Sequence, residues 1–125
     1  MQTQTILLID DDEDEHIIFT DALRAAKINC NCSIANGWEQ AKRILSVVIP
    51  DIIFLDYNMP GINGMECLKK LKQQNTFENV RMYLYSTGIN DNQCKEALKI
   101  GANDCFKKPS SIEKLADLLR AVLIN

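Results

Sequence analysis

The sequence predicts an α/β protein in which strands and helices alternate around a parallel sheet. Two apolar runs, at 5–9 and 52–55, are continuous rather than alternating, which is typical of strands buried on both faces. Amphipathic segments separate the runs, with apolar residues three and four positions apart. Because a parallel connection needs a right-handed crossover, usually a helix, this order predicts a doubly wound (βα)₅ sheet with helices on both faces.

Each expected strand is followed by an expected helix. We predict strands at 5–9, 32–35, 52–55, 82–85 and 104–106. The helices that follow carry apolar stripes that begin near Ile17, Trp38, Met65, Cys94 and Ile112. Asn36 and Asp91 are the expected N-caps of the second and fourth helices, and Ser110 with Glu113 matches a capping box for the last one.

Length and composition indicate one ordinary globular domain, spanning residues 1–125. The chain has 125 residues, of which 46% are hydrophobic and 25% are charged, so disordered and fibrous classes are excluded. Its apolar runs are too short for a transmembrane helix, and the N-terminus lacks a secretory signal, so we expect a cytoplasmic protein. A net charge of −3 gives no general attraction to nucleic acid or to an anionic membrane.

The five cysteines and the single histidine do not form a pattern typical of a metal site. A zinc site would need paired cysteines or additional histidines. We therefore expect reduced thiols that serve as small packing residues, and we expect His16 to be an exposed surface residue.

Polar side chains follow four of the predicted strands. In an open parallel sheet, ligands bind beyond the carboxyl ends of the strands, so these residues are expected to converge at one edge. They are Asp10 and Asp11 after the first strand, Asp56 and Asn58 after the third, Ser86 and Thr87 after the fourth, and Lys107 and Lys108 after the fifth.

This set of side chains is suited to phosphoryl transfer. Three crowded carboxylates raise one another's pKa unless a cation balances them, and Mg²⁺ prefers one or two carboxylates with waters and phosphate oxygens. A lysine and a hydroxyl can neutralise and hydrogen-bond phosphoryl oxygens. A carboxylate held in such a site can act as a nucleophile toward phosphorus.

The motifs resemble the receiver domain of two-component response regulators over nearly the whole chain. They are the Asp10-Asp11 pair, Asp56 within Leu-Asp-Tyr-Asn-Met-Pro-Gly, Ser86-Thr87-Gly88, and Lys108-Pro109. The resemblance implies a flavodoxin-like fold with strand order 2-1-3-4-5.

The resemblance also implies a role for each matching residue. Asp56 would be the phosphoacceptor, and Lys108 would pair with it and later with its phosphoryl group. Asp11, Asp56 and the Asn58 backbone carbonyl would bind Mg²⁺ directly, with Asp10 acting through water. Ser86 would be the switch hydroxyl, with Thr87 in the following position, and Pro109 would follow a cis peptide bond.

Two positions depart from the family pattern. Cys105 stands where receivers usually carry an aromatic residue, three positions before the site lysine, and Asn63 replaces a common aspartate. Because Cys105 is small, we expect phosphorylation to perturb the loop from Ser86 to Asp91 while the surface around Cys105 changes little.

The favoured function is a stand-alone response regulator that is not an enzyme. It would accept a phosphoryl group on Asp56 from the phosphohistidine of a sensor kinase or phosphotransfer protein. No residues remain after the last helix for an output domain, so we expect it to signal through changed protein contacts or to pass the phosphoryl group on to a histidine-containing phosphotransfer protein. The alternative is a Mg²⁺-dependent phosphohydrolase with an aspartate nucleophile. Such enzymes are usually longer and carry further metal-binding acids, which argues against this alternative. A receiver that never becomes phosphorylated is a third possibility, which the intact Asp56, Lys108 and Ser86 set argues against.

Overall fold

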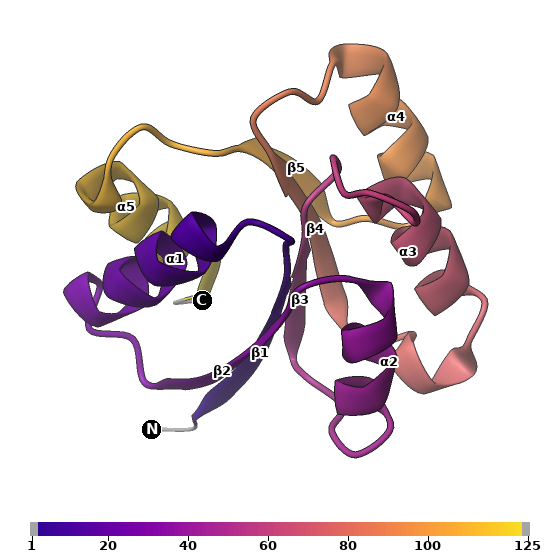
Figure 1. Ribbon diagram of the computed structural model, residues 1–125, viewed down its shortest axis with the longest axis horizontal. Coiled ribbons are helices and arrows are strands. Elements are labelled where there is room, and N and C mark those ends of the chain that lie inside the picture. Colours follow the sequence, from indigo (N-terminus) through magenta and orange to yellow (C-terminus); the bar gives the residue numbers. More distant parts are fainter. Residues whose placement is uncertain (1–2, 124–125) are drawn as a thin grey trace.

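A computed structural model describes residues 3–123 and confirms the predicted alternation (Figure 1). The strands are β1 (Gln4–Ile9), β2 (Cys30–Ala35), β3 (Ile52–Leu55), β4 (Arg81–Ser86) and β5 (Asp104–Lys107). The helices are α1 (Glu13–Ala25), α2 (Trp38–Leu45), α3 (Gly64–Lys72), α4 (Asp91–Ile100) and α5 (Ile112–Leu123), and a short 3₁₀ helix, η1 (Asn75–Phe77), precedes β4.

The strands form a single parallel sheet in the order β2-β1-β3-β4-β5, as the resemblance implied. Helices α1 and α5 cover one face, and α2, α3 and α4 cover the other (Figure 1). All four residues of β3 are buried, because this strand lies in the middle of the sheet with helices on both sides. The fold is therefore a doubly wound, flavodoxin-like α/β fold.

The sheet separates two hydrophobic cores. The core on the α1–α5 side contains an aromatic group in which the Phe19 ring meets the Phe54 ring edge-on at 5.2 Å and the Tyr85 ring at 6.0 Å. The other core lies beneath α2, α3 and α4 and includes Leu68 and Leu71 of α3. Both cores contain strand residues, so the position of each strand end depends on packing from two sides.

In three helices the residue at the N-cap lies one position away from the predicted cap. Gly37 precedes α2 in place of Asn36, and Asn90 caps α4 in place of Asp91, with its side chain accepting from the Gln93 backbone N–H. At α5, Ser111 rather than Ser110 accepts from the Lys114 backbone N–H at 3.1 Å. Neighbouring residues of similar capping ability cannot be separated by propensity alone.

The expectations for the cysteines and for the bond before Pro109 are wrong. Cys94 and Cys105 form a disulfide bond, so the thiols are not all reduced; Cys30, Cys32 and Cys67 are free. The Lys108–Pro109 bond is trans, as are all peptide bonds in residues 3–123. The trans isomer is the lower in free energy even before proline, and the resemblance alone did not determine the isomer.

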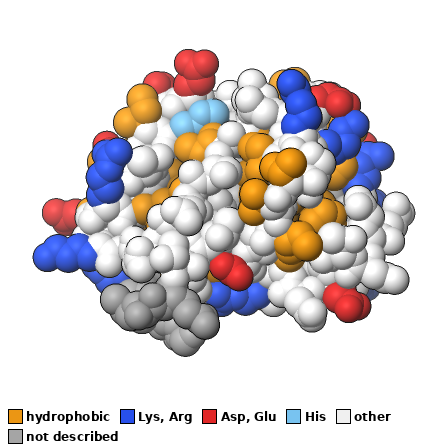
Figure 2. All heavy atoms as spheres, turned by 90° about the horizontal axis from the view of Figure 1, so that it is seen from below, with side chains coloured by type: hydrophobic (Ala, Val, Ile, Leu, Met, Phe, Trp, Pro, Cys, Tyr) orange, Lys and Arg blue, Asp and Glu red, His pale blue; other side chains and the backbone are white. Residues whose placement is uncertain are grey.

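Apolar side chains are exposed at the end of the sheet where β3 begins, which is the end opposite Asp10, Asp56 and Lys108. The connection from α2 to β3 exposes Val47, Val48 and Ile49, with Val47 81% accessible. Figure 2 shows hydrophobic side chains gathered in the middle of its face, with charged side chains mainly at the periphery.

Within the described residues, every helix is too short or too polar to cross a bilayer.

Candidate functional site

The backbone places the site residues directly beyond the strands that carry them. The sheet hydrogen bonds continue one residue past the strand ends, with the Asp10 N–H donating to the Ala35 carbonyl at 3.0 Å and the Asp56 N–H donating to the Ile9 carbonyl at 2.9 Å. The Lys108 N–H donates in the same way to the Ser86 carbonyl at 3.0 Å. Asp10, Asp56 and Lys108 therefore inherit the alignment of β1, β3 and β5.

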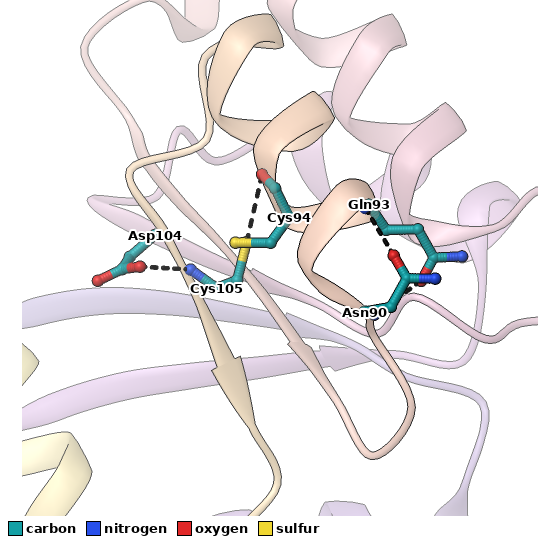
Figure 3. The surroundings of a disulfide bond; sticks show 5 residues. All are labelled: Asn90, Gln93, Cys94, Asp104 and Cys105. Carbon is teal, nitrogen blue, oxygen red and sulfur yellow. Dashed lines mark hydrogen bonds between the residues drawn. A yellow bond between two sulfur atoms is a disulfide. The ribbon is translucent and has the colours of Figure 1, made fainter.

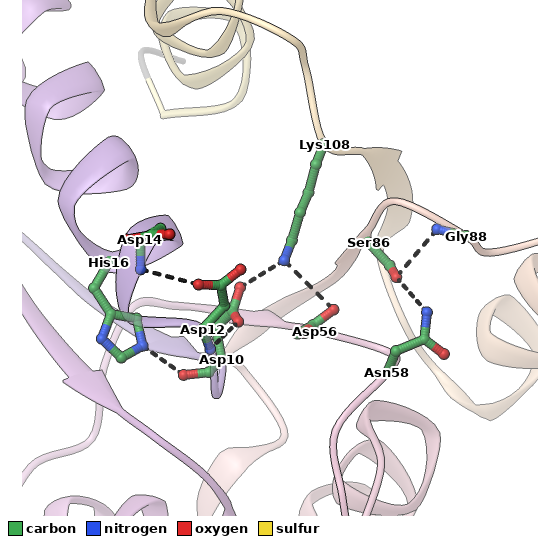
Figure 4. Close-up of polar contacts among 9 residues, drawn as sticks. All are labelled: Asp10, Asp12, Asp14, His16, Asp56, Asn58, Ser86, Gly88 and Lys108. Carbon is green, nitrogen blue, oxygen red and sulfur yellow. Dashed lines mark hydrogen bonds and ion pairs between the residues drawn. The ribbon is translucent and has the colours of Figure 1, made fainter.

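Lys108 is the cation of the site. Its ammonium group lies 2.8 Å from an Asp10 carboxylate oxygen and 3.6 Å from an Asp56 carboxylate oxygen (Figure 4). The same group lies 5.5 Å from the centre of the Tyr85 ring, close enough for a cation–π interaction. The Lys108 side chain is only 7% exposed, so bulk water screens these contacts little. Lys107, by contrast, is exposed.

Three carboxylates gather at the same edge. One oxygen from each of Asp10, Asp11 and Asp56 lies within 4.8 Å of the other two. Asp10 and Asp56 are buried and Asp11 is exposed. One lysine balances only part of this negative charge, and an all-oxygen donor set open to solvent on one side fits a hard divalent cation such as Mg²⁺.

Asp10 already has a partner on each of its carboxylate oxygens. One oxygen accepts from the Asp12 backbone N–H at 2.9 Å, and the other accepts from Lys108. Both carboxylate oxygens of Asp10 are thus engaged within the protein.

The electrostatics distinguish Asp56 from an ordinary aspartate. Burial raises the pKa of Asp56 to about 6, the Asp10 charge adds to the rise, and Lys108 opposes it. Burial by itself would lower the pKa of Lys108, but the hydrogen bond to Asp10 and the charges of Asp10 and Asp56 raise that pKa above its usual value. Lys108 therefore stays charged at neutral pH, while the pKa of Asp56 in the metal-free protein lies well above that of an ordinary aspartate.

Ser86 is fully buried at the end of β4, and its side chain lies on the other side of Asp56 from Asp10, beside Asn58 (Figure 4). The Asn58 side-chain amide donates to it at 3.4 Å, and the Gly88 backbone N–H donates at 3.5 Å. Both hydrogen bonds are long, so they hold the Ser86 hydroxyl group only weakly. Thr87 is exposed in the loop that follows, outside this group of contacts.

Three further residues shape the site without having been predicted from the sequence. A ring nitrogen of His16 makes a hydrogen bond with the Asp10 backbone carbonyl, so this side chain is half-buried rather than exposed. The Tyr85 ring lies against Lys108. Gly64 packs so closely on the Asp56 backbone that a Cβ atom there would lie 2.3 Å from the Asp56 carbonyl oxygen. Of these three residues, only Tyr85 could have been expected near the site from the sequence, because it directly precedes Ser86.

The geometry thus defines a class of protein: a doubly wound α/β protein with a carboxylate cluster and a lysine at the carboxyl edge of its sheet, as in phosphoryl-transfer sites that depend on a metal ion. The comparison with family models gives the family. Residues 6–120 match the response regulator receiver domain, and the chain belongs to that family.

Two relatives illustrate how much the lengths of the matching proteins differ. The chain is 33% identical over 124 residues to the phosphate regulon transcriptional regulatory protein PhoB of Pseudomonas aeruginosa, covering 98% of this chain but 53% of PhoB. It is 28% identical over 123 residues to sporulation initiation phosphotransferase F of Bacillus subtilis, covering 98% of this chain and 96% of that protein. The chain therefore spans about half the length of the first relative and nearly all of the second.

A solved structure has the same fold with little sequence identity. The Mn²⁺-bound form of response regulator Rcp1 aligns with a TM-score of 0.76 at 18% identity, over 95% of this chain and 91% of Rcp1. At this identity the likeness shows the fold alone.

Proposed function

We propose that residues 1–125 form a single receiver domain of a response regulator, in which Asp56 accepts a phosphoryl group from the phosphohistidine of a sensor kinase or a histidine phosphotransfer protein. The observation that carries the proposal is the contact of Lys108 with both Asp10 and Asp56 beside the three-carboxylate cluster. The cytoplasmic partners would supply the phosphoryl group, and a protein target would respond to the changed surface.

In the proposed reaction, an Asp56 carboxylate oxygen attacks the phosphorus atom of the phosphohistidine. The new O–P bond forms as the P–N bond breaks, and the electron pair leaves with the donor's imidazole. Lys108 lies 3.6 Å from Asp56 and would follow the charge onto the phosphoryl oxygens. Ser86 would donate its hydroxyl hydrogen to another phosphoryl oxygen, while Thr87 lies next in the loop.

The residues present fit a Mg²⁺ ion as the cofactor. Asp11, Asp56 and the backbone carbonyl of Asn58 would hold the ion, and Asp10 would assist through water. When bound, the ion neutralises charge on the phosphoryl group during transfer. The structure of a Mn²⁺-bound form of the response regulator Rcp1, which has the same fold, supports the proposal of a divalent ion as cofactor.

Asp56→Asn tests the phosphoacceptor directly. Wild-type protein incubated with phosphoramidate and Mg²⁺ should gain the mass of one phosphoryl group, and Asp56→Asn should gain none, because the amide is a far weaker nucleophile. Intact-mass spectrometry provides the measurement. The matched control is Asp51→Asn, which makes the same change just before β3 and should be labelled like wild type.

Equal labelling of wild type and Asp56→Asn would overturn the assignment. Steady turnover of a generic phosphomonoester by wild type, lost in Asp56→Asn, would instead favour the phosphohydrolase alternative.

Asp11→Ala tests the metal site. Mg²⁺ should raise the Tm of wild type, because a ligand that binds only the folded state stabilises it by mass action, by about 2.7 kcal/mol at 100 times Kd. Asp11→Ala should abolish most of that rise, while Asp14→Ala, which removes an exposed acid in the first turn of α1, should retain it. Thermal melts with and without Mg²⁺ give the comparison; an undiminished rise in Asp11→Ala would contradict the ligand role.

A further inference from the structure

The disulfide bond joins the first half of α4 to the edge strand β5 (Figure 3). The Cα atoms of Cys94 and Cys105 are 6.0 Å apart, within the usual range for a disulfide. Eleven positions separate the two residues in the sequence, so the bond closes a short loop that contains most of α4. Both residues are partly accessible to solvent.

The bond lies beside the loop that leads from the site. Cys105 pairs with Leu84 in the sheet, two residues before Ser86. On the helix side, the Cys94 backbone N–H donates to the Asn90 carbonyl at 3.0 Å, and the capping box between Asn90 and Gln93 holds the first turn (Figure 3). The segment from Ser86 to Asn90 therefore runs between the site and a helix turn that is covalently attached to β5.

Apart from this bond, α4 is weakly attached to the rest of the protein. Ala97 is its single buried residue, whereas α3 and α5 bury five residues each. Leu98 of α4 is 44% exposed, and the ion pair between Lys69 and Glu96 spans 3.6 Å between exposed side chains, so it contributes little. A helix with so little buried surface opens readily unless it is cross-linked.

We propose that Cys94 and Cys105 form a reversible redox pair that gates the movement of α4 and of the loop before it when Asp56 is phosphorylated. The oxidised pair clamps α4 to β5, and the reduced pair releases it. The inference rests on the proposed function, because it assumes that a phosphoryl group on Asp56 draws Ser86 inward. It also replaces the expectation that the surface around Cys105 changes little on phosphorylation: we expect that small change only in the oxidised protein.

The redox step is thiol–disulfide exchange with a small-molecule disulfide such as oxidised glutathione. One protein thiolate attacks a glutathione sulfur, forms a mixed disulfide and releases one glutathione thiolate. The second protein thiolate then attacks the protein sulfur of the mixed disulfide and releases the other. Two protein thiols are oxidised, one glutathione disulfide is reduced to two thiols, and the two protons pass to the departing thiolates.

The first test uses the unphosphorylated full chain and does not depend on the proposed function. After equilibration in glutathione buffers of increasing oxidation, alkylation and peptide mapping should show Cys94 and Cys105 losing their thiols together, while Cys30 stays alkylatable. Amide hydrogen exchange within α4 should be on the order of 100-fold slower in the oxidised protein than in the reduced one, as expected for closing a short loop. Exchange that is unaltered by reduction would overturn the clamp.

The second test measures the response to phosphorylation. With Mg²⁺ and beryllofluoride, which mimics a phosphoryl group on aspartate, amide chemical shifts across α4 should change more in the reduced protein than in the oxidised protein. Cys94→Ser and Cys105→Ser should respond like the reduced protein under both conditions, whereas Cys30→Ser should keep the redox dependence.

The failure of each proposal gives a different result. If Asp56 gains no phosphoryl mass in either redox state, the proposed function fails, and the exchange result for α4 stands by itself. If Asp56 is labelled in both states and α4 responds equally in both, the redox gate is wrong and the phosphoacceptor assignment stands.

Discussion

Replacing Gly64 with alanine should lower the free energy of unfolding by about 1 to 3 kcal/mol or more. The added Cβ would lie 2.3 Å from the Asp56 carbonyl oxygen, 2.8 Å from the Asp56 carbonyl carbon and 2.9 Å from the Tyr57 Cα. All three atoms belong to the backbone, so no side-chain rotation relieves the overlap. The Gly64 N–H also donates to the Tyr57 carbonyl at 3.1 Å, which prevents the start of α3 from moving away without cost.

The same change should impair the site. Relief of the overlap requires the backbone at Asp56 to shift, and the distance from its carboxylate to Lys108 changes with it, so labelling by phosphoramidate should slow markedly. Urea unfolding and intact-mass labelling measure the two effects. The control is Gly88→Ala, where a Cβ would meet the Asn58 amide nitrogen at an ordinary 3.5 Å; its stability should stay within about 1 kcal/mol of wild type. A Gly64→Ala protein as stable as Gly88→Ala would contradict the close packing.

Asp56→Asn should make the metal-free protein more stable at pH 7, by up to about 2 to 3 kcal/mol. Burial and the Asp10 charge raise the pKa of Asp56 from 3.8 to about 6. Between these two pH values the folded protein binds more protons than the unfolded chain, so the free energy of unfolding falls as the pH rises from about 4 to 6. Asparagine has no such titration, and the remaining Asp10–Lys108 contact, at 2.8 Å, is the shorter of the two ion pairs.

Urea unfolding in EDTA at pH 4 and at pH 7 would measure this effect. The advantage of Asp56→Asn should be largest at pH 7 and should shrink toward pH 4, whereas the exposed control Asp51→Asn should show no comparable pH dependence. Saturating Mg²⁺ should reverse the order of stability, because wild type alone retains the full set of ligands. A stability difference that stays constant from pH 4 to pH 7 would contradict a titrating Asp56.

The parts of the structure that could be predicted from the sequence are those with a strong local cause. The prediction for β3 coincides with the observed strand because its four residues are all apolar and the charged residues Asp51 and Asp56 stand on either side of them. The convergence of Asp10, Asp56 and Lys108 followed from strand polarity, since parallel strands end at one edge. The strand order itself came from the resemblance to receivers and not from the residues.

The rest depended on contacts between distant segments. Nothing in the separation of Cys94 and Cys105 indicates that the first half of a helix faces the neighbouring strand. The close packing of Gly64 on Asp56 likewise arises from how the intervening loop returns to the sheet. His16 was predicted to be exposed because acids surround it in the sequence, but the first turn of α1 directs its ring toward the Asp10 carbonyl. In each case the contact is made with a residue or backbone group whose position in space a local sequence pattern does not predict.

The ion pair between Lys108 and Asp10 joins residues that are 98 positions apart in the sequence. During synthesis, the early strands are complete long before the ribosome releases the lysine. Until β5 docks, Asp10 and Asp56 face each other without their native cation, and contacts of such high sequence separation form late and slowly. The site is therefore complete only once the last strand has docked, and a chain that lacks β5 displays both aspartates without the lysine that balances them.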